Sequence, residues 1–135
     1  MVTNIDQEMY ALYRNRGDES FEDVSHANEI AQTTRQMSGW GLKFVDFDHD
    51  GNLDLFVVNG HPDDMIESYS QQVTYREPLL LFRNNGKALE NVSEEAGPLF
   101  AKNYAARGLA VGDTTNDGRV DVLVAVNGKH AGAGT

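Results

Sequence analysis

The residues with the clearest chemical potential form one acidic run, Asp46-Phe47-Asp48-His49-Asp50-Gly51-Asn52-Leu53-Asp54. Carboxylates stand at positions 1, 3, 5 and 9 of this run, and glycine stands at position 6. Alternate spacing turns the carboxylates of a tightly curled loop toward one point, and Gly51 permits the positive φ that folds the chain back. The backbone carbonyl of Asn52, at position 7, is a further expected ligand. The run therefore predicts a site for a hard divalent cation.

Calcium is the cation that this ligand set favours. Two unit charges 4 Å apart repel by about 4 kcal/mol at an effective dielectric constant near 20, so converging carboxylates need a cation between them. Calcium accepts 6 to 8 oxygen ligands in flexible geometry, whereas magnesium demands a strict octahedron and keeps its waters. We therefore expect Ca²⁺, held by a first candidate set of Asp46, Asp48, Asp50, Asn52 and Asp54.

A second acidic run follows later in the chain, Asp113-Thr114-Thr115-Asn116-Asp117-Gly118-Arg119-Val120-Asp121. Acids remain at positions 1, 5 and 9, but Thr115 replaces the acid at position 3. Arg119 stands at position 7 and adds a positive charge, so this site is expected to bind calcium more weakly. The second candidate set is Asp113, Thr115, Asp117, Arg119 and Asp121.

Two other interpretations share part of the pattern of the acidic runs. An EF-hand shares the Asp-x-Asp-x-Asp-Gly pattern but needs a bidentate Glu at position 12 and flanking helices. Position 12 of the first run is Val57, and its flanks are rich in Val, Phe and Leu, which favours strands. The remaining alternative is a hairpin turn rich in Asp and Gly that binds no ion.

The elements that position these runs repeat along the chain. Residues 41–60 return as residues 108–128, so that Asp46 matches Asp113 at an offset of 67. A second motif interleaves with the first, because residues 12–25 return as residues 81–93, and Leu12 matches Leu81 at an offset of 69. Two motifs with one shared period indicate a tandem repeat.

Each motif is typical of a β-hairpin. Strands are expected over 42–47 and 53–59 around the first acidic turn, and over 79–83 and 88–92 around Asn85-Gly86, a strong hairpin signal. A unit of four antiparallel strands predicts an all-β fold built from β-propeller blades. The chain, 1–135, then holds two blades' worth: a half blade at 10–25, a complete blade at 40–93 and a half blade at 107–128.

The two terminal hairpins lack partners in this arrangement. A stacked repeat needs about three units to bury its faces, and open strand edges invite pairing with other chains. The chain is therefore expected to be either a fragment of a longer protein or a homo-oligomer. In the second case, complementary half blades of about three or four copies close a ring.

Composition argues against several classes of partner and of chemistry. Eleven Lys and Arg against 21 Asp and Glu give a formal charge of −10, which disfavours binding to nucleic acid. No apolar run approaches the roughly 18 residues of a spanning helix, so no membrane span is expected. The first residues do not look like a signal peptide, and the absence of cysteine excludes disulfides and thiol catalysis.

The acidic runs, together with Leu55-Phe56-Val57-Val58-Asn59-Gly60 and Leu81-Phe82-Arg83-Asn84-Asn85-Gly86, resemble the FG-GAP/VCBS repeats of integrin α-subunit propellers and bacterial exported proteins. Within that group, Asn59-Gly60-His61 and Arg107-Gly108-Leu109-Ala110 are most similar to repeats of the ASPIC/UnbV and cartilage acidic protein type. The resemblance implies a seven-bladed, sometimes six- or eight-bladed, propeller with calcium in the blade loops. It also implies an extracellular or periplasmic location and a role in cell adhesion or ligand recognition. No catalytic motif is recognised, so a non-catalytic module is expected.

Two alternatives concern the long connection over 61–78. A carbohydrate-active enzyme would use His61, Asp63, Asp64 and Glu67 as an acid/base cluster. A lectin-like module would instead stack a sugar on Trp40 or on the segment from Tyr69 to Tyr75. The ordinary account of both features is a solvated acidic loop and an aromatic side chain packed between blades.

Overall fold

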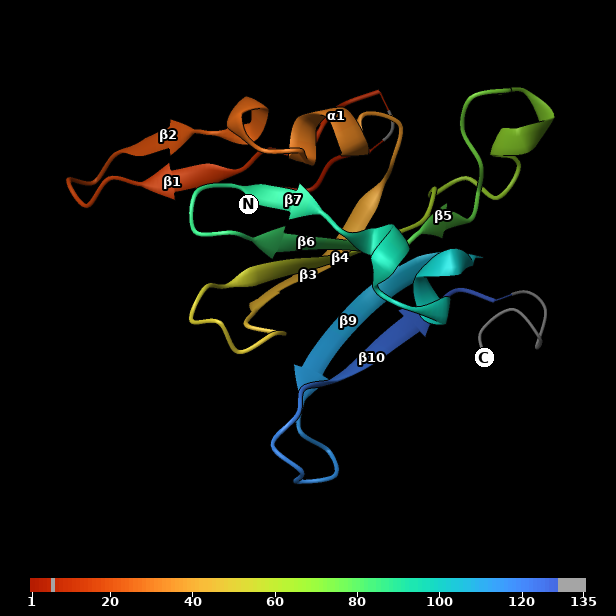
Figure 1. Ribbon diagram of the computed structural model, residues 1–135. Coiled ribbons are helices and arrows are strands. Elements are labelled where there is room, and N and C mark those ends of the chain that lie inside the picture. The colour runs from red at the N-terminus through yellow and green to blue at the C-terminus, as the bar shows by residue number, and fades with distance from the viewer. Residues whose placement is uncertain (6, 129–135) are drawn as a thin grey trace.

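A computed structural model describes residues 1–5 and 7–128 of the chain (Figure 1). Its centre is one antiparallel sheet in the order β3-β4-β6-β7, formed by β3 (Gly39–Val45), β4 (Asp54–Asn59), β6 (Leu80–Asn84) and β7 (Leu89–Asn91). Every residue of β4 is buried, because this strand has neighbours on both edges and packed layers on both faces. The predicted four-stranded antiparallel unit is thereby confirmed.

Two further hairpins flank the central sheet. β1 (Tyr13–Asn15) pairs with β2 (Phe21–Asp23), and β9 (Ala106–Gly112) pairs with β10 (Asp121–Val126). Figure 1 shows the first hairpin beside β6 and β7, and the second on the other side of the sheet, next to β3. The β-rich architecture predicted from the repeat is therefore observed as a half unit, a whole unit and a half unit.

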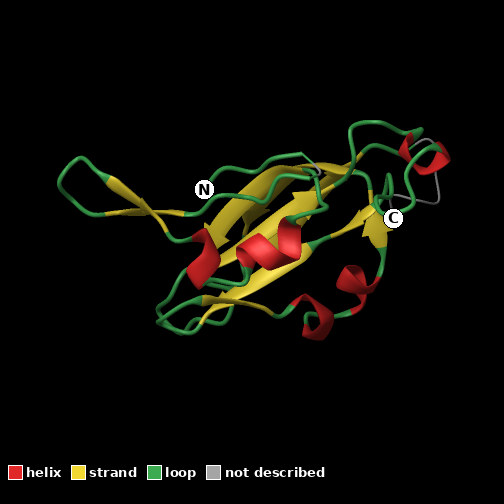
Figure 2. Cartoon of the chain, turned by 90° about the horizontal axis from the view of Figure 1, so that it is seen from above, coloured by secondary structure: helices red, strands yellow, loops and turns green. Residues whose placement is uncertain are grey.

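The remaining elements are short connections around these hairpins (Figure 2). Strands β5 (Glu77–Pro78) and β8 (Asn103–Tyr104) form a small separate pair. The linker after the first hairpin holds the short helix α1 (Ile30–Thr34). Single 3-10 turns lie at Ser25–Ala27, Ile66–Ser68, Ser93–Glu95 and Pro98–Ala101. No helix in the described part of the chain is long and apolar enough to cross a membrane.

Apolar side chains cover both faces of the central sheet. On one face, Leu55, Val57 and Phe82 pack with Tyr10 and Ile30 from the N-terminal region. On the other face, Phe56 and Val58 of the same strand belong to a cluster with Leu109 and Val122 of the β9–β10 hairpin. Alternation along β4 thus turns successive side chains toward opposite neighbours. Burying one large apolar side chain stabilises the fold by about 1.5–3 kcal/mol, so β4 holds the layers together.

The predicted strand bounds differ from the observed ones around the first acidic turn. The strand predicted over 42–47 is β3, which begins at Gly39 and ends at Val45. It begins earlier because Gly39 pairs with Asn59, with a β-bulge before Leu42. It ends earlier because Asp46 already belongs to the turn, where its carboxylate accepts backbone N–H groups.

Candidate metal centre

The first acidic run forms the loop between β3 and β4, at one end of the central sheet (Figure 1). Both oxygens of Asp46 accept backbone hydrogen bonds, from the N–H of Asp50 at 3.1 Å and from the N–H of Gly51 at 2.9 Å. The backbone turns with positive φ at His49 (55°) and Gly51 (88°). The glycine at position 6 thus has the role that the spacing predicts, and the loop folds back on the first carboxylate.

Three carboxylates gather in this loop. Ligand oxygens of Asp46, Asp48 and Asp50 all lie within 4.8 Å of one another. Asp46 is half-buried, while Asp48 and Asp50 are exposed, so the cluster opens to solvent. Hard oxygen donors at alternate positions around a curled backbone fit the preferences of a divalent cation such as Ca²⁺.

Asp54, the fourth predicted carboxylate, has a different position. Its side chain is 2% exposed, and its two oxygens accept the backbone N–H of Phe47 at 3.1 Å and of Asn84 at 2.8 Å. The carboxylate therefore joins the loop to β6 and does not belong to the clustered three. Asn52 lies between them in sequence, and its backbone N–H donates to Asp50 Oδ1 at 2.9 Å.

Arg83, at the end of β6, is a member of the site that the sequence reasoning missed. Its Nε donates to Asp48 Oδ2 at 2.9 Å, and its Nη2 lies 3.8 Å from Asp50 Oδ2. The hydrogen bond from Arg83 holds the pKa of Asp48 below its usual range. The signal that could have found it is the repeat itself, since Arg14 and Arg83 occupy the same place in the two copies of Leu-aromatic-Arg-Asn.

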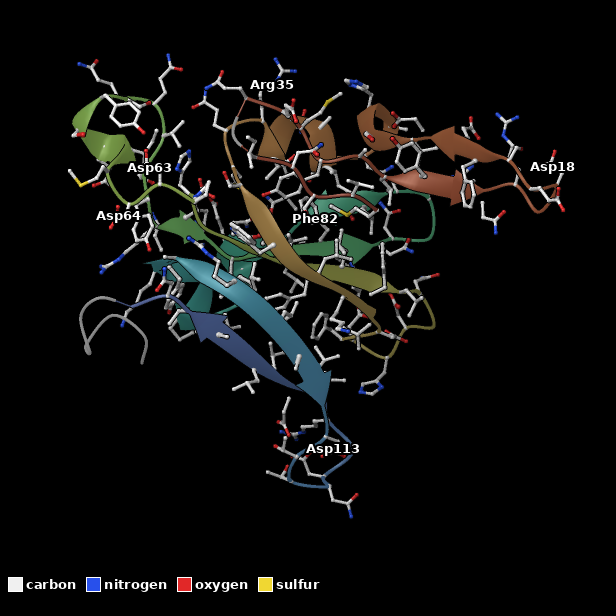
Figure 3. All side chains as sticks on the ribbon, turned by 180° about the vertical axis from the view of Figure 1, so that it is seen from behind. Asp18, Arg35, Asp63, Asp64, Phe82 and Asp113 are labelled. Carbon is white, nitrogen blue, oxygen red and sulfur yellow. The ribbon has the colours of Figure 1, made fainter. Side chains whose placement is uncertain are left out.

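The second acidic run forms the loop between β9 and β10 and has the same backbone pattern. Asp113 accepts the N–H groups of Asp117 at 3.0 Å and Gly118 at 2.8 Å. Positive φ recurs at the fourth and sixth positions, Asn116 (57°) and Gly118 (81°). The two loops therefore share one conformation, as the sequence repeat predicts. Figure 3 shows the side chain of Asp113 in this projecting loop.

The second set of candidate ligands is less closely gathered. Asp121 Oδ2 accepts from the N–H of Thr114 at 2.8 Å and from its hydroxyl at 2.7 Å, which lowers the pKa of Asp121. Arg119 donates its backbone N–H to Asp117 Oδ1 at 2.9 Å. Thr115 adds no carboxylate, and within the described residues Asp46, Asp48 and Asp50 form the one cluster of three acids close enough to share an ion.

The 61–78 connection leaves the opposite end of the sheet from the first acidic loop (Figure 1), and Figure 3 shows Asp63 and Asp64 within it. His61 is 5% exposed, and its Nδ1 accepts the backbone N–H of Asp63 at 3.0 Å. Glu67 Oε1 accepts the N–H of Tyr75 at 3.3 Å. These side chains thus take part in holding the connection itself in shape.

Trp40 lies where the central sheet meets the next hairpin, as the packing interpretation predicts. Its indole N–H donates to the carbonyl of Gly60 at 2.7 Å, and the guanidinium carbon of Arg107 lies 4.6 Å from its ring centroid. Arg107 also donates to the carbonyl of His61 at 2.9 Å. The Trp40 ring therefore makes a cation–π contact with the C-terminal hairpin and a hydrogen bond to its own unit, and it contributes to the packing between the two units.

Comparison with protein families matches residues 1–57 to the FG-GAP-like repeat. The matched part contains the N-terminal hairpin, β3, the first acidic loop and β4 as far as Val57. No curated protein matches the chain.

Proposed function

Through residues 1–57 the chain belongs to the FG-GAP-like repeat proteins, whose repeat is a β-propeller element, and from this premise we propose that it is a calcium-binding, non-catalytic recognition module. The finer likeness to the ASPIC/UnbV and cartilage acidic protein type stays part of this proposal. Calcium braces the turns between strands, and the connecting loops recognise a protein or glycan ligand in an adhesive role. The proposed location is extracellular or periplasmic.

The observation that carries the calcium proposal is the gathering of Asp46, Asp48 and Asp50 within 4.8 Å of one another. The backbone N–H groups of the loop already orient Asp46, so part of the cost of arranging the ligands is met before an ion arrives. Ligands from positions 1, 3 and 5, with the carbonyl of Asn52, would hold the ion at this loop. Asp54 would support it by fixing the loop to β6.

Calcium supplies charge compensation at this loop rather than chemistry. An ion that binds the folded loop and not the unfolded chain stabilises the fold by RT ln(1 + [L]/Kd), which is about 2.7 kcal/mol at a hundredfold excess over Kd. The second loop, with Asp113, Asp117 and Asp121, is proposed as a weaker site of the same kind. Thr115 at position 3 and Arg119 at position 7 are its further candidate ligands. Its shared backbone conformation supports this assignment.

The proposed recognition role is based on the exposed loops that connect the strands of the sheet. Long loops on a rigid scaffold are where binding groups tend to lie, and the 61–78 connection is the longest excursion from the sheet (Figure 1). Sugar stacking on Trp40 is not favoured, because Arg107 lies against the ring. An acid/base role for His61 is not favoured either, because its Nδ1 accepts a backbone hydrogen bond.

Thermal unfolding with calcium and with a chelator tests the metal site. In roughly 5 mM calcium, above the 10⁻⁴–10⁻³ M Kd range of extracellular modules, the Tm should rise by about 5 °C or more over the chelated protein. Asp48→Asn should remove most of this rise, because Asp48 is a clustered ligand with no backbone-capping bond of the kind Asp46 makes. Asp18→Asn, in the N-terminal hairpin turn, removes the same charge elsewhere and should keep the rise. Equal melting temperatures with calcium and chelator would contradict the proposal.

A further inference from the structure

The two half units have the same strand registers as the matching halves of the whole unit. Val111 pairs with Val122 in the C-terminal hairpin just as Phe44 pairs with Leu55 in the central sheet. Tyr13 pairs with Asp23 in the N-terminal hairpin as Phe82 pairs with Asn91. The hairpins β9–β10 and β1–β2 are therefore, strand for strand, the first and the second half of one unit.

In the central sheet the two halves join through β4 and β6, with Leu55 opposite Phe82, Phe56 opposite Leu81 and Val57 opposite Leu80. Within the described residues, β10 pairs only with β9 and β1 only with β2. We propose that a second copy of this chain joins its β1 to the outer edge of β10 and so completes a four-stranded unit. The repeat fixes the register of this joint: Val122 lies opposite Tyr13, Leu123 opposite Leu12 and Val124 opposite Ala11 of the second copy.

Charge complementarity supports the joint. In the central sheet, Arg83 follows Phe82 and reaches Asp48 and Asp50 of the first acidic loop. The equivalent arginine, Arg14, is exposed in the middle of β1. In the completed unit, Arg14 of the second copy faces Asp117 in the second acidic loop, and the N–H of its Asn15 meets Asp121 as the N–H of Asn84 meets Asp54.

Apolar complementarity points to the same partner. Leu123 is 71% exposed, whereas Phe56, its equivalent in the central sheet, is 2% exposed under the following hairpin. A groove of about 330 Å³ lies between the N-terminal hairpin and the central sheet, and its apolar lining includes Leu12, Phe44 and Leu53. In the joint, Leu123 of one copy turns toward this groove of the second copy, where Phe44 and Leu53 are 41% and 56% exposed.

The chain edge that leads into β1, to which β10 of another copy would pair, already has an antiparallel partner at one position. Val2 pairs with Ala11 through two backbone hydrogen bonds, of 2.8 Å and 2.9 Å. Ala11 corresponds to Leu80, which pairs with Val57 in the central sheet. Val2 thus occupies the place that Val124 of the second copy takes in the joint, and assembly exchanges one antiparallel partner for a longer one. Because each copy offers two different edges, the contact is head-to-tail, and copies joined in this way form a ring when the rotation between them closes.

Solution mass tests the assembly without reference to calcium, since the joint depends on strand edges. Light scattering should give a mass that is a multiple of 14.9 kDa and larger than the monomer, in calcium and in chelator alike. Leu123→Asp should shift the mass to the monomer, whereas Met65→Asp, which changes a side chain that is 60% exposed in the 61–78 connection, should leave it unchanged. A monomeric mass at every protein concentration, including concentrations above a Kd of about 1 μM, would overturn the proposal. Failure of calcium binding alone would not affect it.

Cysteine cross-linking tests the register itself, because the chain contains no cysteine. Tyr13→Cys and Val122→Cys, made in separate chains and mixed, should form a disulfide dimer on oxidation, since opposed residues bring their Cα atoms to about 4.5–5.5 Å. Tyr13→Cys mixed with Val124→Cys is the control, because that diagonal separation of about 7–8 Å is too long. Equal cross-linking of both mixtures, or of neither, would refute the proposed joint, with circular dichroism of each variant confirming the fold.

Discussion

Arg83 and Asp48 join the two hairpins of the central sheet, with Arg83 Nε 2.9 Å from Asp48 Oδ2. The same guanidinium lies 3.8 Å from Asp50, so one cation faces two of the three gathered carboxylates. The side chain of Arg83 is 51% exposed, so water screens this attraction strongly. A divalent ion that binds Asp48 and Asp50 must share these oxygens with Arg83 or displace it.

Arg83→Gln should therefore strengthen calcium binding. Removing a positive charge beside the site lowers the electrostatic cost of adding a divalent ion, and about 1 kcal/mol at such exposed distances corresponds to a roughly fivefold lower Kd. Isothermal titration calorimetry measures this change. Arg16→Gln removes a charge from the N-terminal hairpin turn, where Arg16 lies near Glu22, and should leave the Kd unaltered. A weaker Kd in the Arg83 variant would show that the guanidinium helps to shape the site.

Asp54→Asn should destabilise the fold by about 2 kcal/mol, within the range for a buried hydrogen-bonding group left unsatisfied. The buried carboxylate accepts two backbone N–H groups, and an amide in its place must turn an NH₂ group toward one of them. Urea unfolding in chelator measures the loss apart from any metal. Asp121→Asn changes the equivalent residue in the second loop, which has no β6 partner in the described residues, and should cost less than half as much. Equal losses would mean that the bond to Asn84 contributes little.

Much of the fold follows from the repeat. Asp46 and Asp113 are separated by the same offset as the strands around them. Similar sequences adopt the same strand registers, so the four-stranded sheet and both half units were predictable. The loop conformation was predictable as well, since Gly51 and Gly118 stand at the position that requires positive φ.

The contacts between elements were not predictable in the same way. The acidic pattern placed Asp54 with the other carboxylates, but pairing of β4 with β6 brings the N–H of Asn84 to it. Arg83 reaches the loop because the register sets Phe82 opposite Leu55, and this pairing joins residues distant in sequence. Spacing along one segment records which side chains share a loop, and it does not record which distant backbone groups will compete for them.

The N-terminal hairpin should lose stability at acid pH through Asp23. Its Oδ1 accepts the hydroxyl of Ser25 at 2.5 Å and the N–H of Ser25 at 3.0 Å, and the hydroxyl bond, followed by the backbone bond, lowers the pKa of Asp23 below its ordinary value of 3.8. A folded-state pKa below the unfolded value gives stability that is full above the unfolded pKa and is lost as the pH falls through the folded pKa. Unfolding measured from about pH 5 to pH 2 should show this loss.

Asp23→Asn is the matched variant for that measurement. The chain itself has Asn91 at the equivalent place in the central sheet, where the side chain accepts the same two bonds from Ser93, at 2.6 Å and 3.1 Å. The variant should therefore keep the fold at neutral pH and show a flatter dependence on pH below about 4. An unchanged slope would assign the acid sensitivity to other carboxylates, such as Asp18 beside Ser20, whose pKa is also lowered by its hydrogen bonds to that serine.

Gly60→Ala should severely weaken the contact between the central sheet and the C-terminal hairpin. A Cβ at this position would lie 2.8 Å from the Cα of Ala105 and 2.9 Å from the backbone nitrogen of Ala106, and backbone atoms at such distances cannot give way locally. Overpacking of this kind costs about 1–3 kcal/mol, and the Tm should fall by roughly 5 °C or more. Gly112→Ala is the control, because nothing lies within 4 Å of its added Cβ. If both variants melt alike, the two backbones are free to separate, and the close approach at Gly60 does not fix how one unit packs on the next.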